Sequence, residues 1–202
     1  MKNLAVFASG NGTNLQAIIQ AVKDGEIPAK IALVVSDRAD SYALKRAEKA
    51  EIKTLFVNPK DFTNRQSFDR DVVIHLKNEN IDYIVLAGYM RLLSPYFIKE
   101  YHQKIINIHP SLLPNYKGMQ AIKDALTYGA KVTGVTVHFV DEKMDHGPII
   151  MQEPLKIRPE DTLDVLTQRV HALEHRVYPK AVELLVKGKL KVKGRQVQVL
   201  DS

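Results

Sequence analysis

Short apolar runs and segments of helical periodicity alternate along the first half of this chain. The apolar runs have the length of strands buried on both faces, and they are residues 4–8, 31–35, 54–57 and 83–87. Apolar residues recur at helical spacing between them, in residues 15–22, 42–50 and 66–77. Strands that alternate with helices in this way predict a parallel sheet with right-handed crossovers.

The second half changes pattern. A short apolar strand at residues 105–109 and a helix around 121–126 precede a strongly alternating strand at 132–140. We expect that strand to pair with residues 149–155, and we expect a long helix with an apolar stripe from 163 to 184. The pattern predicts an α/β fold, a Rossmann-like three-layer sandwich with a mostly parallel central sheet and helices on both faces. It predicts a single domain over residues 1–202.

Composition adds limits on compartment and partners. The 202-residue chain has no cysteine, so it offers no disulfide and no thiolate ligand. No apolar run approaches the ~20 residues of a membrane span, and no signal peptide precedes the first strand; we therefore expect a cytoplasmic protein with no membrane partner. The net charge of +6 favours anionic partners. The basic segment 187–195 has no aromatic residue to stack on bases, so a solvated C-terminal hairpin is favoured over nucleic-acid binding.

The strand at residues 105–109 carries candidate chemistry. Side chains alternate along a strand, so Asn107 and His109 project from the same face. An amide donor beside a ring that titrates near neutral pH suits oxyanion stabilisation with proton transfer. The alternative is an asparagine and a histidine that are merely hydrogen-bonded in the core.

A second candidate is the turn at residues 9–14 (SGNGTN), between the first strand and the first helix. Gly12 allows close approach of an anion, and Thr13 or Asn14 could cap the helix. The turn matches neither the dinucleotide fingerprint nor the P-loop, so a plain strand-to-helix turn remains an alternative. In open parallel sheets, ligands bind beyond the carboxyl ends of the strands. This turn, residues 88–93 and the end of the 105–109 strand all belong to that edge.

Two further stretches, residues 141–145 and 171–175, contain carboxylates that could serve the same site. A carboxylate beside His109 would stabilise the imidazolium, and Asp145 is our candidate from the acidic connection 141–145.

His171, Glu174 and His175 spell the inverted zinc-peptidase pattern H-x-x-E-H. A catalytic zinc needs a third protein ligand, so we predict no metal here. Glu174 could instead reach a bound polar ligand. We expect His138, inside the alternating strand, to be a structural histidine.

The motifs ASGNGTNLQAI, LAGYMRLLSP, NIHPSLLP, TGVTVHFV and HGPII follow one another in an order that closely resembles the phosphoribosylglycinamide formyltransferases. The resemblance runs from the first strand to the last long helix. It implies formyl transfer from 10-formyltetrahydrofolate to the amine of glycinamide ribonucleotide in purine biosynthesis, by direct attack and without a metal. It also implies small-molecule substrates, no nucleic-acid partner, and a monomer or homodimer.

The resemblance also implies roles for particular residues. Asn107, His109 and Asp145 match the catalytic trio of the family. The substrate-binding positions for phosphate and ribose are Gly12, Thr13, Asn14 and Glu174. The folate-binding positions are Arg65, Met90, Arg91, Leu92 and Leu93. On this basis residues 1–100 form a phosphate-binding half, and residues 101–202 form a catalytic and folate-binding half with the C-terminal helix and basic tail.

Two positions depart from the family pattern, and other functions stay open. Residues 117–120 (KGMQ) stand where relatives carry Pro-Gly and a different polar pair, and His146 stands where a small residue is common and is expected at a turn surface. Formyltetrahydrofolate hydrolases and methionyl-tRNA formyltransferases share the trio, and we expect them to carry a further N-terminal or C-terminal domain. A non-catalytic nucleotide or folate sensor would use the same turn at residues 9–14 to bind an anion and would not need the catalytic trio.

Overall fold

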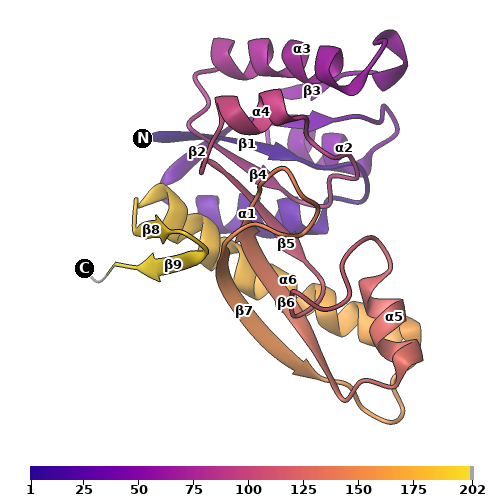
Figure 1. Cartoon of the computed structure of the whole chain (residues 1–202). Coiled ribbons are helices and arrows are strands. Elements are labelled where there is room, and N and C mark those ends of the chain that lie inside the picture. The colour runs from indigo at the N-terminus through magenta and orange to yellow at the C-terminus, as the bar shows by residue number, and fades with distance from the viewer. Residues whose placement is uncertain (201–202) are drawn as a thin grey trace. The chain divides into compact units, whose positions relative to one another are not determined.

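The structure is a computed structural model that describes residues 1–200, and it forms two compact units. The first unit is Met1–Ile106, and the second unit begins at Asn107. Strand β5 (Ile105–His109) contains the point at which one unit gives way to the other. Figure 1 shows the elements in chain order.

The first unit is built on parallel strands in the order β3-β2-β1-β4. The strands are β1 (Lys2–Phe7), β2 (Ala29–Ser36), β3 (Thr54–Phe56) and β4 (Tyr83–Leu86). Leu4, Val6 and Phe7 are fully buried, as expected of a central strand covered on both faces. The buried apolar runs thus form the core of this unit.

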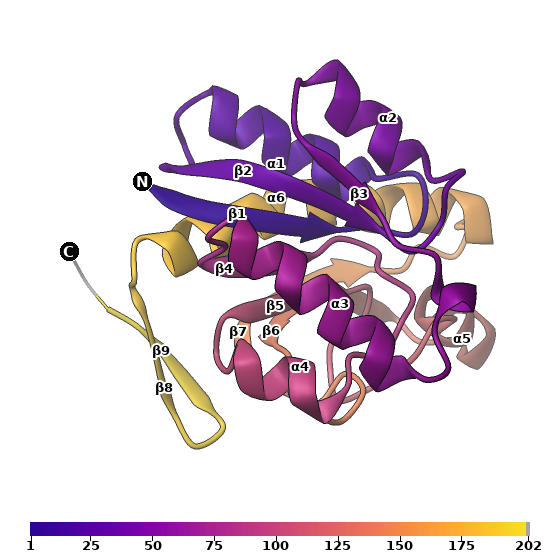
Figure 2. The same cartoon turned by 90° about the horizontal axis from the view of Figure 1, so that it is seen from above.

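The helices of the first unit cover both faces of these strands. They are α1 (Thr13–Lys23), α2 (Tyr42–Lys49), η1 (Pro59–Asp61), α3 (Arg65–Asn78) and α4 (Pro95–Glu100). Figure 2 shows α1 and α2 on one side of the strands and α3 and α4 on the other. Helix α3 starts with a capping box between Asn64 and Ser67. Helix α4 starts with a Ser94 cap followed by proline at its first position.

The second unit consists of a strand pair, two helices and a terminal hairpin. Its elements are α5 (Ala121–Tyr128), β6 (Val132–Phe139), β7 (Ile149–Lys156), α6 (Leu163–Val186), β8 (Leu190–Lys193) and β9 (Gln196–Val199). Strands β6 and β7 pair antiparallel, with a register shift between Val137 and His138. Strand β9 pairs parallel with β7 at its start and antiparallel with β8. The long helix α6 packs against β6 and β7.

These elements confirm the predicted α/β class, with a mixed, mostly parallel arrangement of strands flanked by helices. The basic segment does form a C-terminal hairpin, β8–β9. Helices η1 and α4 were not expected, because three or six residues are too few for a clear helical period. No helix among residues 1–200 is long and apolar enough to cross a membrane. The single-domain organisation and the cytoplasmic location stay predictions.

Candidate active site

Asn107 and His109 occupy the end of β5, at the start of the second unit. Their side chains lie on the same face because side chains alternate along the strand. Asn107 is half-buried and His109 is buried. A buried polar side chain needs hydrogen-bond partners, so the neighbours of these residues define what the site can do.

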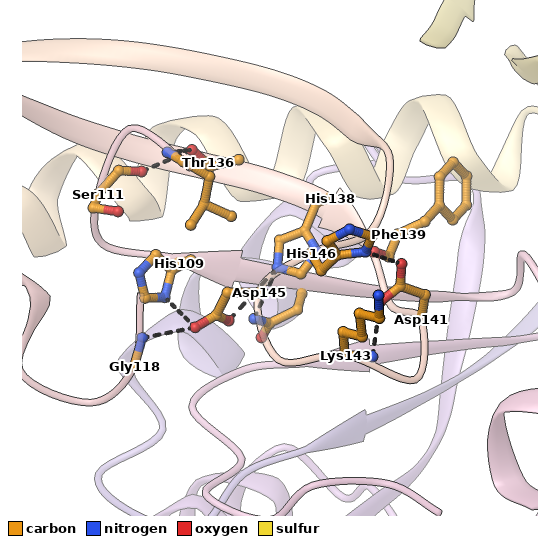
Figure 3. A network of polar contacts seen from close by, with 12 residues as sticks. His109, Ser111, Gly118, Thr136, His138, Phe139, Asp141, Lys143, Asp145 and His146 are labelled. Atoms are coloured by element: carbon orange, nitrogen blue, oxygen red, sulfur yellow. Dashed lines mark hydrogen bonds and ion pairs between the residues drawn. The ribbon is translucent and has the colours of Figure 1, made fainter. Parts of the chain in front are cut away.

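Asp145 lies beside His109, on the loop that joins β6 to β7 (Figure 3). Its Oδ2 atom is 3.5 Å from His109 Nδ1 and accepts a hydrogen bond of 2.8 Å from the backbone N–H of Gly118. Its Oδ1 atom is 4.0 Å from Nε2 of His138. Asp145 has a left-handed backbone, with φ of +48°. The carboxylate therefore faces two histidines in a mostly buried position.

The second ring nitrogen of His109 also faces an oxygen. Nε2 donates a hydrogen bond of 2.8 Å to the backbone carbonyl of Tyr116, because a carbonyl can only accept. With Asp145 near Nδ1, both ring nitrogens face acceptors. A histidine ring that faces oxygen atoms at both nitrogens is placed to take part in proton transfer.

His138 fixes the orientation of the Asn107 amide. Its Nδ1–H donates to the Phe139 carbonyl at 2.8 Å, so Nε2 is the acceptor of the neutral ring. Asn107 Nδ2 donates to that Nε2 at 3.3 Å and keeps its second proton for another acceptor. Burial lowers the pKa of His138, and this favours the neutral form. We expected a structural histidine, and the contact with Asn107 places His138 at the site.

Residues that the sequence analysis did not select hold the segment after β5. Thr136 donates to the Ser111 carbonyl at 2.7 Å and accepts from the Leu113 N–H at 3.0 Å. Gln152 donates to both Thr136 and the Leu113 carbonyl. The segment leads to Tyr116 and Gly118, whose backbone groups contact the catalytic candidates. The only signal in the sequence was the period of β6, which puts Thr136 and His138 on one face.

The turn at residues 9–14, here called the anion loop because it is predicted to bind an anion, lies in the first unit, between β1 and the first residues of α1. Gly12 precedes the helix with φ of +71°, and a Cβ there would lie 2.7 Å from Cβ of Ala43. Over the residues that the structure describes, no side chain caps α1, so the expected cap by Thr13 or Asn14 is wrong: the helix already begins at Thr13. The N-terminus of a helix that follows a glycine-containing turn can bind an anion through its backbone N–H groups.

An open cavity of about 460 Å³ adjoins this loop. Its lining residues are Ser9, Gly10, Asn11, Arg38, Asp40, Ser41 and Tyr42. The loop backbone is held by α2, because the Gly10 carbonyl accepts from Ser41 Oγ and from the Ala43 N–H. Arg46 donates to the Asn11 carbonyl at 2.8 Å. The anion loop is thus a fixed structure beside a cavity.

Ser9 joins the anion loop to the predicted folate-binding residues. Its hydroxyl donates to Asp37 at 2.6 Å and accepts from the Met90 N–H at 2.9 Å. Met90 and Leu92 are 56% and 55% exposed, which leaves apolar side chains available to a flat ligand. The Arg91 guanidinium lies over the Phe68 ring.

A buried carboxylate holds the end of residues 90–93. Asp69 accepts from the Ser94 N–H at 2.5 Å, and burial raises the pKa of Asp69. Arg65, the predicted folate-contacting arginine, is the first residue of α3, the helix that also carries Asp69. All these residues belong to the first unit. The predicted folate-binding residues therefore lie in the first unit, whereas the sequence analysis assigned folate binding to residues 101–202; both assignments stay predictions.

The structure thus groups the predicted site residues in two sets. Asn107, His109 and Asp145 lie together in the second unit, and Glu174 is buried on α6 of that unit. The anion loop and residues 90–93 adjoin each other in the first unit. Among residues 1–200, no group of three or more histidines and carboxylates is placed to hold a metal ion.

Comparison with known proteins identifies the family. A model of the formyl transferase family matches residues 2–182. Phosphoribosylglycinamide formyltransferase of Bacillus subtilis is 44% identical over 92% of this chain and 95% of its own length. The crystal structure of glycinamide ribonucleotide transformylase 1 from Symbiobacterium toebii covers all of this chain and 95% of its own, with a TM-score of 0.97 and 43% identity.

A more distant structure shares the fold. A formyltetrahydrofolate deformylase from Pseudomonas syringae has a TM-score of 0.91 at 26% identity, and the match covers 99% of this chain and 66% of that one. The much higher identity to the transferases, over nearly the full length of both proteins, separates the two groups. The chain belongs to the phosphoribosylglycinamide formyltransferase family.

Proposed function

We propose that this protein transfers the formyl group of 10-formyltetrahydrofolate to the amine of glycinamide ribonucleotide. The observation that carries the proposal is the grouping of Asn107, His109 and Asp145 in a mostly buried site with defined hydrogen-bond directions. An amide donor, a protonated ring and a carboxylate are what acyl transfer between two amines requires. Family membership supports the same reaction.

The reaction proceeds by direct attack. The substrate amine adds to the formyl carbon and forms a carbon–nitrogen bond, while the carbonyl electrons move to oxygen. The free Nδ2 proton of Asn107 and the ring of His109 stabilise the resulting oxyanion. The tetrahedral intermediate collapses when the bond between the formyl carbon and the folate nitrogen breaks. His109 gives a proton to the leaving nitrogen and takes up in return the proton that the attacking amine releases, so the protons balance and tetrahydrofolate departs.

The surroundings of the trio explain how these roles are kept distinct. Neutral His138 accepts one Asn107 proton, so the amide cannot turn its oxygen toward the oxyanion without losing that bond. Asp145 stabilises the charged form of His109. Since Nε2 of His109 donates to the Tyr116 carbonyl, that bond must be exchanged for one with the reacting group. The Gly118 N–H donates to Oδ2 of Asp145 and helps to hold this carboxylate beside His109.

The binding roles follow the two sets of residues. The N–H groups at the start of α1, around Gly12, Thr13 and Asn14, take the ribonucleotide phosphate. Glu174 accepts from the ribose hydroxyls. Arg65 and residues 90–93 (Met90, Arg91, Leu92 and Leu93) bind folate, with the arginines facing its carboxylates and the exposed Met90 and Leu92 facing its ring.

The test is formyl transfer by the purified protein, with each substrate omitted in turn. We expect product only when glycinamide ribonucleotide and 10-formyltetrahydrofolate are both present, and no loss of activity with a metal chelator. Release of formate from the folate without the ribonucleotide would instead assign a hydrolase, the second candidate that the deformylase-like fold supports. Tight binding of both ligands without turnover would assign a non-catalytic binding protein.

A further inference from the structure

The turn of the C-terminal hairpin reaches the loop that carries Asp145. Arg195 follows Gly194, which has φ of +61°, in the two-residue turn between β8 and β9. Its Nη2 atom donates to the backbone carbonyl of His146 at 2.7 Å. Its Nη1 atom lies 3.3 Å from Nε2 of the same histidine. One guanidinium thus binds both the backbone and the ring of the residue next to Asp145.

The His146 ring extends this contact to the other end of the loop. Its Nδ1 atom lies 2.6 Å from Oδ2 of Asp141, and the carboxylate acceptor assigns the proton to Nδ1. Nε2 is then the acceptor for Arg195. Oδ1 of Asp141 accepts from the Lys143 N–H at 3.0 Å. A chain of hydrogen bonds from Arg195 therefore ties together the start and the end of the 141–147 loop.

The backbone on either side leaves this loop little freedom. A Cβ at Gly147 would lie 1.8 Å from the Phe139 carbonyl oxygen, so the residue after His146 is packed directly on the end of β6. Strand β9 pairs with β7 through Gln196 and Ile149. The hairpin is thus fixed to the strand that follows the loop, one residue after Arg195. A guanidinium held in this way fixes the His146 peptide.

We infer that Arg195 is a positioning residue for Asp145 and acts through the His146 peptide, so that the C-terminal hairpin contributes to the active site. The inference rests on the proposed catalytic role of Asp145. Asp145 has a left-handed backbone, which aspartate adopts more readily than most non-glycine residues but still at a cost, so contacts from neighbouring residues help to hold it. The hairpin lies beyond residues 2–182, which the family model matches, so the contact of Arg195 with His146 is outside the matched part of the chain.

The test compares Arg195→Ala with Lys191→Ala, which removes an exposed cation from the same hairpin. We expect Arg195→Ala to lower kcat about 10-fold, because a small misplacement of a catalytic group is costly, with the KM for each substrate unchanged. Both variants should melt within a few degrees of the wild type, and Lys191→Ala should keep its kcat. Arg195→Lys should recover part of the loss, since an ammonium group can still donate to the His146 carbonyl.

A double-variant cycle separates this inference from the proposed function. If Arg195 acts through Asp145, then Asp145→Asn with Arg195→Ala should be no slower than Asp145→Asn alone. Independent, multiplying losses would overturn the inference, as would an Arg195→Ala protein with the kcat of Lys191→Ala. A loss in Arg195→Ala that appears as a lower melting temperature with raised KM would show a purely structural role. Normal turnover in Asp145→Asn would overturn the role of Asp145 itself, and this inference with it.

Discussion

The amide of Asn107 has one proton committed to His138 and one left for substrate. We therefore expect Asn107→Ala to lower kcat by about 100- to 1,000-fold, the typical loss of one oxyanion donor, or about 2.7–4 kcal/mol of barrier. The KM for each substrate should change little, because the oxyanion exists only in the transition state. Steady-state kinetics of formyl transfer measure both quantities. Near-normal turnover would contradict the assignment of Asn107.

His138 makes the stability of the protein depend on pH. Burial lowers its pKa, although the Phe139 carbonyl and the nearby Asp145 and Asp141 favour the charged form and His109 opposes it. A depressed histidine pKa means that the unfolded chain binds more protons than the folded one below the usual value of about 6.5. The contribution of His138 is therefore fully present above pH 6.5 and is lost as the pH falls.

We expect the free energy of unfolding of the wild type to fall from pH 7 to pH 5 by more than that of His138→Gln. Gln keeps a side-chain acceptor for the Asn107 amide but cannot take up a proton in this range. Denaturant unfolding at a series of pH values measures the difference. Parallel pH profiles for the two proteins would show that His138 titrates as it does in the unfolded chain.

Single residues also show where sequence reasoning succeeds. The pairing of Asn107 with His109 on one face follows from the two-residue period of a strand, and the structure places Asp145 beside His109. The backbone donors and acceptors of the site, such as the Gly118 N–H and the Tyr116 carbonyl, could not be predicted. Every residue carries these groups, so their use depends on loop conformation and leaves no trace in side-chain type.

At the scale of elements, we expect the loop before α1 to require glycine at position 12. Gly12 and Gly25 both have positive φ, but only Gly12 faces a neighbour, Ala43, within 4 Å. Each change to Ala should cost about 1 kcal/mol from backbone strain. Gly12→Ala should cost more because its Cβ would overlap Ala43.

Gly12→Ala should also raise the KM for the ribonucleotide, since the loop would have to move away from α2. Gly25→Ala is the matched control, with the backbone strain but no overlap, and its KM should stay at the wild-type value. Thermal melting and steady-state kinetics of the two variants test this pair. Equal KM values in the two variants would argue against the phosphate-binding role of the loop.

Most elements could be predicted because each is a segment with a clear period. The apolar run of β1 and the helical stripe of α3 are examples, and their observed bounds, Lys2–Phe7 and Arg65–Asn78, differ from the expected ones by a few residues. The prediction that Thr13 or Asn14 caps α1 was wrong for a local reason. Gly12 is the N-cap residue and has a left-handed backbone, so the helix starts without a side-chain cap. The contact of Arg195 with His146 joins residues 49 apart and needs the pairing of β7 with β9.

On the scale of the whole molecule, the order of motifs carried more information than any motif alone. The Asn107 strand and the anion loop each had a plain structural alternative, whereas their order along the chain identified the family that the comparisons show. The C-terminal hairpin has no such motif, and composition indicated only that its cations would be solvated. Arg195 is exposed, and it also binds the loop that carries Asp145 and His146.

The net charge of +6 is a property of the whole chain with its own consequence. The proposed substrates carry phosphate and carboxylate groups, so long-range attraction should raise their encounter rate. Salt screens such attraction beyond roughly 10 Å at 0.1 M ionic strength. We expect kcat/KM for the ribonucleotide to fall several-fold as salt rises from about 0.02 M to about 0.5 M. Turnover at saturating substrate should stay unchanged, because groups already in contact are screened much less. A value of kcat/KM that is independent of salt would mean that the loop around Gly12 binds the phosphate without help from the overall charge.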